Sequence, residues 1–300
     1  MNTIHTKTFI ALTASALTAA ALGVAPTADA TCISAFGLGS GGQCTSTLAS
    51  IAIAIGENAD AHADGFLGAA LTLGNASSAE TAAGALMNFA VTFGDSNFTS
   101  AGGIGSIAAV ANSINQTVIA GAGSFSNGSI ANIAVSLASP EASQIIAAGI
   151  GNLSVNLAGG GNVAGTGVGL TTVNFVGLGS TLVNVGTLNN ITNFTGNNNT
   201  ITNDVGDGGI ANLAFNVIGS DNLITTRGAL AVAGAFGSVG QTVSQDGPGV
   251  NISFLRQSAT RSSARVANAA AAQTDSSAGT DRDSGVTKAK ASSARARDNR

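Results

Sequence analysis

The stretch that decides the fold reads VNFV at residues 173–176 and recurs as LAFNV at residues 213–217. Both runs alternate apolar with small or polar residues, which is typical of a β-strand, and glycines nearby indicate turns. Five phenylalanines mark the recurrence at nearly even spacing, and they are Phe175, Phe194, Phe215, Phe236 and Phe254. A strand and turn recurring about every 20 residues predict a solenoid, in which each coil packs on its neighbours.

The pattern extends toward the N-terminus as IAIAIG at residues 51–56, ALTLG at 70–74 and FAVTFG at 89–94. It blurs through residues 100–128, where Val118-Ile119 is the best candidate strand, and returns after residue 131. The sequence therefore predicts an all-β fold, a single β-solenoid over residues 51–255. It would hold about ten coils and extend ~50 Å at ~4.8 Å per stacked strand.

Two sets of side chains are expected to stack from coil to coil. We predict that the five phenylalanines form a core ladder, each ring on the ring of the next coil. Asn132, Asn152 and Asn212 also occupy matching positions. They have two interpretations, an amide ladder in which each side chain bonds its copies, or asparagines that serve only the turns.

Residues 1–30 have the pattern of a secretory signal peptide. His5 and Lys7 precede an apolar run at residues 9–24, and ADA at residues 28–30 offers small residues for cleavage. The mature chain would begin at Thr31, with no membrane span left after cleavage. The predicted location is secreted, or at the surface of the cell envelope.

The two cysteines, Cys32 and Cys44, lie close together at the predicted mature N-terminus. In an exported protein such a pair most often forms a disulfide. We therefore predict an N-terminal disulfide loop over residues 31–50, which would cap the first coil and keep it from fraying.

Charge is distributed unevenly along the chain. Residues 31–255 hold ten acidic side chains and one basic one, whereas residues 256–300 hold nine basic and four acidic ones. The second segment is rich in Ala, Ser and Arg and lacks aromatic residues, which predicts a disordered basic tail. An acidic body excludes nucleic acid as a partner, because phosphate contacts need Lys and Arg.

Few residues offer chemistry. The one histidine after residue 30, His62, lies between Asp60 and Asp64, and on a strand the three would share a face. They are a weak candidate metal site, and the alternative is a polar outward face. No catalytic residue is assigned, and no Gly-x-Ser-x-Gly motif provides a nucleophile.

A second cluster combines Asp204, Asp207, Asp221 and Arg227. Asp204 and Asp221 are separated by about one coil length and would be stacked neighbours. Carboxylates beside an arginine are typical of Ca²⁺-assisted lyase sites on β-helices. The alternative function is therefore a polysaccharide-active β-helix enzyme that uses this cluster, with Ca²⁺ as the only cofactor considered.

Two resemblances add to these patterns. IAIAIGENADA at residues 51–61 resembles the head repeats of trimeric autotransporter adhesins. GNNNTITN at residues 196–203 and GSDNLIT at residues 219–225 resemble the repeats of exported Ala/Gly/Asn-rich β-solenoid proteins of mycobacteria and related actinobacteria. These resemblances imply an exported solenoid, and neither transfers a functional residue.

The first functional hypothesis is a non-enzymatic structural or adhesive protein of the cell envelope or extracellular space. A repetitive solenoid face would do the binding, since repeat arrays offer extended surfaces. The expected partners are a cell-wall or extracellular polymer, a host surface, or other copies of the chain.

Overall fold

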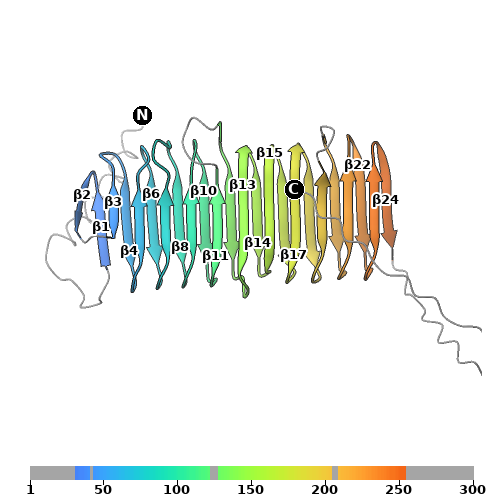
Figure 1. The fold of residues 1–300 in the computed structure, drawn as a ribbon, viewed down its shortest axis with the longest axis horizontal. Coiled ribbons are helices and arrows are strands. Elements are labelled where there is room, and N and C mark those ends of the chain that lie inside the picture. Colours follow the sequence, from blue (N-terminus) through green and yellow to red (C-terminus); the bar gives the residue numbers. More distant parts are fainter. Residues whose placement is uncertain (1–30, 41–42, 122–127, 205–208, 255–300) are drawn as a thin grey trace, which may run out of the picture. The chain divides into compact units, whose positions relative to one another are not determined.

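The computed structural model describes residues 31–40, 43–121, 128–204 and 209–254. In these residues the chain is all-β, and it winds into a solenoid of about eleven turns (Figure 1). The predicted fold class is thus confirmed, with one coil more than expected. The predicted signal peptide and basic tail lie outside the described residues.

Two sheets form the walls of the solenoid. The 13-stranded sheet, called sheet A here, has the spatial order β2 (Leu38–Ser40), β1 (Thr31–Ala35), β4 (Ile51–Ile55), β6 (Ala69–Leu73), β8 (Phe89–Phe93), β10 (Ile107–Ala111), β12 (Ile133–Leu137), β14 (Leu153–Leu157), β16 (Thr171–Val176), β18 (Asn190–Thr195), β20 (Leu213–Val217), β22 (Ala231–Phe236) and β24 (Gly249–Phe254). The 11-stranded sheet, called sheet B, has the order β3 (Cys44–Ser46), β5 (Asp60–Ala63), β7 (Ser78–Thr81), β9 (Phe98–Ala101), β11 (Gln116–Ala120), β13 (Ser143–Ile150), β15 (Gly161–Val168), β17 (Ser180–Thr187), β19 (Thr200–Asp204), β21 (Leu223–Arg227) and β23 (Thr242–Asp246).

Each coil contributes one strand to sheet A and the next strand to sheet B. From β4 onward neighbouring strands of sheet A are parallel and in register, as in the pairing of Ile51 with Ala69. The coil length varies, because Val232 pairs with Val250 across a short coil, whereas Ile107 pairs with Ile133 across a longer one. The bends between the sheets absorb this difference.

The N-terminal end is capped as the cysteines predicted. Strand β1 lies antiparallel to β4, and the short β2 folds back along its other edge. The disulfide joins Cys32 of β1 to Cys44 of β3, with 5.6 Å between their Cα atoms, so it ties sheet A to sheet B. A short antiparallel edge strand of this kind keeps other chains from pairing with the sheet.

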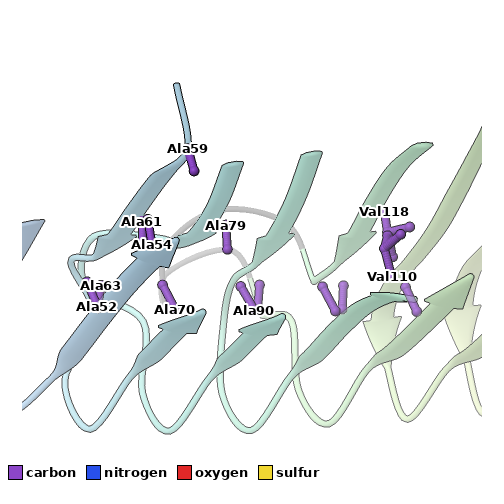
Figure 2. Packing of buried hydrophobic residues seen from close by; sticks show 14 of the residues in the cluster. Ala52, Ala54, Ala59, Ala61, Ala63, Ala70, Ala79, Ala90, Val110 and Val118 are labelled. Atoms are coloured by element: carbon purple, nitrogen blue, oxygen red, sulfur yellow. The ribbon is translucent and has the colours of Figure 1, made fainter. Parts of the chain in front are cut away.

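The interior of the N-terminal coils is filled by small side chains, whereas the later coils also bury large aliphatic residues such as Ile145, Leu182 and Ile201. Along β4, Ala52 and Ala54 are fully buried, while the three isoleucines of the strand point outward. Figure 2 shows the row of inward alanines continuing through Ala70 and Ala90. The inward positions of sheet A are mostly Ala, Ser, Thr and Asn, and most of the larger buried side chains come from sheet B.

The phenylalanine ladder predicted for the core is wrong in its position. Phe194, Phe236 and Phe254 are 44%, 41% and 65% exposed, so they lie on the outer face of sheet A. Phe175 and Phe194 do stack, with ring centroids 5.0 Å apart, and Phe236 contacts Phe254 at 6.4 Å. In each strand the residues next to the phenylalanines point inward, so the phenylalanine rings point outward.

The ladder is also interrupted at its centre. Phe215 is in register with Thr192 and Gly234, so it belongs to a different column from the other four phenylalanines. Its ring covers Gly234, where an added Cβ atom would come within 2.3 Å of the ring. Val217 is the residue of β20 that pairs with Phe236.

An amide ladder does run through the interior, but it uses other asparagines. The amide nitrogens of Asn174, Asn193 and Asn216 each donate to the side-chain oxygen one coil earlier, at 2.9, 2.8 and 2.8 Å. The first acceptor is Asn156, and all four side chains are fully buried. Hydrogen bonds that satisfy buried amides on both sides make coil stacking specific as well as favourable.

The asparagines singled out from the sequence clamp the backbone instead. The Oδ1 of Asn132 accepts from the backbone N–H of Asn152 at 3.2 Å, and its Nδ2 donates to the Gly149 carbonyl at 2.7 Å. Asn212 repeats this arrangement on Ala231 and Gly228. These side chains bond backbone groups of the neighbouring coil at the bends, so the turn interpretation fits them and the amide ladder is wrong for these asparagines.

The bends from sheet B to sheet A place one residue per coil in the left-handed region. In successive coils this residue is Gly151, Gly169, Leu188, Ala211 and Leu230, with φ between 55° and 65°. A left-handed conformation costs a residue with a Cβ atom about 1–2 kcal/mol, and glycine adopts it freely. The chain therefore carries local strain wherever glycine is missing from this column.

We expect Ala211→Gly to raise the free energy of unfolding by about 1 kcal/mol, because it removes this strain. Gly151→Ala is the matched reverse change. A Cβ atom at Gly151 would meet nothing within 4 Å, so its expected loss of about 1 kcal/mol would come from φ alone. Denaturant midpoints of both variants measure the effect, and a shift of Ala211→Gly to lower denaturant would contradict it.

Candidate binding surfaces

The outer face of sheet A is mainly apolar along its length, and its polar side chains include Thr171 of β16 and Asn190 and Thr192 of β18. In the strands from β4 to β20 it is formed by the outward side chains of the first, third and fifth residues. In β22 and β24 it is formed by the residues in register with these. The middle column, for example, runs through Ile53, Leu71, Val91, Ala109, Val135, Val155, Val173, Thr192, Phe215, Gly234 and Ile252. No strand of sheet A contains an Asp, Glu, Lys, Arg or His. This surface is called the apolar face below.

The apolar surface continues around the bends that lead from sheet B to sheet A. Isolated parallel bridges connect these bends from coil to coil, as between Ile104 and Ile130 and between Ile130 and Ile150. Ile130, Ile150, Leu188 and Leu230 are all exposed there. Large exposed apolar patches of this kind mark sites of interaction.

The outer face of sheet B is mainly polar. Its first column holds hydroxyl and amide side chains in five successive strands, namely Thr117, Gln144, Asn162, Thr181 and Thr200. Phe98 precedes this series, and Leu223 separates it from Thr242. The hydroxyl and amide groups of the series repeat at the strand spacing of about 4.8 Å. This surface, the outward side chains of β5 to β23, is called the polar face below.

The acidic side chains of the described residues avoid the apolar face. One group is exposed on the bends that lead from sheet A to sheet B, and it consists of Glu57, Asp95, Glu141 and Asp221. A second group lies on strands of sheet B, and it consists of Asp60, Glu80, Asp204 and Asp246. Asp64 alone lies on a bend from sheet B to sheet A, directly after β5. One long edge of the apolar face is therefore acidic, while the opposite edge is lined mainly by the apolar bends.

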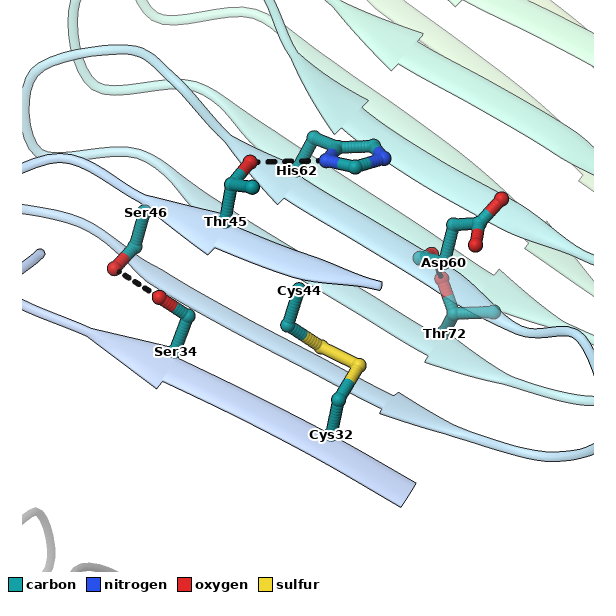
Figure 3. Close-up of a disulfide and its surroundings, with 8 residues drawn as sticks. All are labelled: Cys32, Ser34, Cys44, Thr45, Ser46, Asp60, His62 and Thr72. Atoms are coloured by element: carbon teal, nitrogen blue, oxygen red, sulfur yellow. Dashed lines mark hydrogen bonds between the residues drawn. A yellow bond between two sulfur atoms is a disulfide. The ribbon is translucent and has the colours of Figure 1, made fainter. Parts of the chain in front are cut away.

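The predicted metal ligands around His62 are not assembled into a site. His62 Nδ1 lies 2.9 Å from Thr45 Oγ1 (Figure 3). The same hydroxyl donates to Asp64 at 3.2 Å. In the described part of the chain no group of three or more His, Cys, Asp or Glu side chains is placed to hold a metal ion. Thr45 thus connects the His62 imidazole to the Asp64 carboxylate. This arrangement fits the alternative interpretation, a polar outward face.

The predicted Asp/Arg cluster is brought together only in part among the described residues. Asp204, at the end of β19, is in register with Arg227, which in turn is in register with Asp246. Asp221 lies at the opposite end of β21, where its carboxylate accepts a hydrogen bond from Asn198 at 3.2 Å. Asp207 falls outside the described residues. The expectation that Asp204 and Asp221 are stacked neighbours is wrong, because one coil contains two strands and places them at opposite bends.

No protein-family model and no curated protein sequence matches this chain. The described residues include no helix long and apolar enough to cross a membrane. The functional conclusion therefore rests on the surfaces of the solenoid. Sequence reasoning missed the apolar face, although its signal was visible as the absence of charge from every sheet A run.

Proposed function

We propose that this chain is a non-enzymatic structural or adhesive protein, exported to the cell envelope or extracellular space, that binds an extended polymer through the polar face. The observation that carries this proposal is the register of hydroxyl and amide groups over five successive strands of sheet B, from β11 to β19. An extended polymer with repeated hydroxyl or amide groups presents a matching series of weak hydrogen bonds. Many weak contacts on one rigid support give avidity without any strong single site.

Three further features support an exported structural role. The N-terminal segment has the pattern of a signal peptide, and a disulfide closes the first coil. Disulfides persist in oxidising compartments outside the cytosol. Of the described residues considered for an enzyme, Asp204 and Arg227 are in register on neighbouring strands, whereas Asp221 lies at the opposite bend, apart from them.

The proposal is tested by co-sedimentation of the expressed chain with isolated envelopes of the source organism. We expect it to pellet with little dependence on salt, because uncharged hydrogen bonds are not screened. Thr181→Val/Thr200→Val removes two neighbouring hydroxyls of the polar face and should weaken binding about tenfold. Thr171→Val, a half-buried outward threonine of sheet A, is the matched control and should pellet like the wild type.

Two results would count against this proposal. If the Thr181→Val/Thr200→Val variant and the Thr171→Val control bind envelopes equally, the polar face does not take part in binding. Binding that disappears at high salt, and in a chain ended at Leu255, would make the basic segment 256–300 the anchor instead. The intact mass of the secreted chain is measured first, and cleavage before Thr31 is the expected result.

A further inference from the structure

The apolar face is too large to remain in contact with water without a partner. It spans eleven strands of sheet A, from β4 to β24, and each strand contributes about five residues. At ~4.8 Å between strands and ~3.3 Å per residue it covers roughly 800 Å². The largest apolar patch on a monomeric protein is about 300–600 Å², and a standard interface buries about 800 Å² on each partner.

We propose that the apolar face is covered by the apolar face of a second copy of this chain, with the two A sheets packed face to face. A mainly apolar surface without charge is complementary to itself, because few polar side chains on it, among them Thr171, Asn190 and Thr192, lose water when the two faces meet. Stacked sheets pack ~10 Å apart with their side chains interdigitated. The area available on one copy is what a stable dimer requires.

The distribution of charge selects one arrangement of the two copies. Glu57, Asp95, Glu141 and Asp221 all lie along one edge of the apolar face. The opposite edge is less acidic, because Asp64 is the one acidic residue on its described bends and Arg227 lies in register between Asp204 and Asp246 at the adjoining strand ends. A twofold axis parallel to the direction of coil stacking places each acidic edge beside the less acidic edge of the other copy. The alternative axis, parallel to the strands, brings the two acidic edges together, which is unfavourable.

A second copy fits this face better than a lipid surface does. Proteins that lie on membranes use Lys and Arg to attract anionic lipids, and Trp and Tyr at the headgroup level. The chain contains no Trp or Tyr, and Arg227, the one Lys or Arg of residues 31–255, lies on sheet B. The ten acidic residues of the same segment would be repelled by an anionic membrane.

The arrangement is tested by the mass of the full expressed chain in solution, measured by analytical ultracentrifugation over a range of concentrations. We expect a species of twice the chain mass. Val155→Lys, in β14 at the middle of the apolar face, should weaken association at least about a hundredfold, because two charges would be buried together. Val183→Lys, an equally half-buried outward valine in β17 of sheet B, is the matched control and should remain dimeric.

The axis is tested with a single added thiol, since both native cysteines are in the disulfide. With the axis along the stacking direction, Leu71 faces Leu71 of the other copy, so Leu71→Cys should give a cross-linked dimer with a short bis-maleimide. With the other axis Leu71 faces the opposite end of the sheet, and no cross-link would form. Circular dichroism of each variant establishes that the fold is retained.

Two outcomes overturn the proposal. One is a monomer at every concentration, and the other is a dimer that persists in Val155→Lys but dissociates in Val183→Lys. Binding of a monomeric wild type to neutral phosphatidylcholine vesicles, lost in Val155→Lys, would assign the apolar face to lipid instead. The mass is measured without envelopes, so a monomeric chain would overturn the dimer but not polymer binding by the polar face. Likewise, a chain that does not bind envelopes would leave the dimer proposal unaffected.

Discussion

Asn193→Leu is expected to lower the free energy of unfolding by about 3 kcal/mol, which makes it one of the two most damaging single changes that we predict. Asn193 donates to Asn174 at 2.8 Å and accepts from Asn216 at 2.8 Å, in a site fully closed to water. Leucine has nearly the same size but leaves the Asn174 oxygen without its donor. A buried polar group without a partner costs about 1–3 kcal/mol, and the lost bonds add to this.

The control for this change is Asn162→Leu. Asn162 is an exposed residue of β15 on the polar face, so its replacement should alter stability by less than about 0.5 kcal/mol. Denaturant titrations followed by circular dichroism provide both values. Equal midpoints for the two variants would show that the amide ladder contributes nothing to stability.

Ala90→Leu is the second change with a large expected effect, a loss of about 3 kcal/mol. Ala90 is fully buried in β8 and is in register with Ala70 and Ala108, which are also buried. The three added carbon atoms have no space between the sheets, so they must displace the backbone or force unfavourable rotamers. Overpacking of a filled core costs about 1–3 kcal/mol, and a row of alanines leaves little room for relief.

The neighbouring Phe93 provides the opposite test. It points outward from the same strand, and we expect Phe93→Ala to cost less than Ala90→Leu in the monomer, although it removes a whole aromatic ring. An ordinary hydrophobic core would give the reverse order, because truncating a buried phenylalanine costs about 3–5 kcal/mol. Measurement of both variants at low protein concentration keeps self-association out of the comparison. A larger loss for Phe93→Ala would contradict the inside-out arrangement.

Period-two alternation and the regular recurrence of the runs predicted the coils well. The runs at 51–56, 70–74 and 89–94 correspond to β4, β6 and β8, and Val118-Ile119 lies in β11. The register blurred through residues 100–128 because the coil that begins at Ile107 is longer than its neighbours and closes only at Ile133. Strands of sheet B were harder to find, since they contain more polar residues and show less contrast with the bends.

The orientation of each strand could not be predicted from the pattern. Alternation fixes two faces but does not say which points inward, and hydrophobicity favours Ile53 over Ala54 for the interior. In sheet A the inward positions hold mainly small residues, whereas in sheet B they also hold Ile, Leu and Val, so hydrophobicity alone gives the wrong orientation for sheet A. The Asp204–Asp221 pairing failed for another reason, because one coil contains two strands and the two residues lie at opposite bends.

Unequal coils in one continuous register also make this chain a natural acceptor of added sequence. The coils that begin at Ile107 and Asn190 carry their additional residues between β11 and β12 and between β19 and β20, while the paired strands on both sides keep their alignment. A peptide grafted at either junction would be displayed at a fixed height along the stack. Lineages of such chains can therefore diversify what they present without altering the framework that presents it.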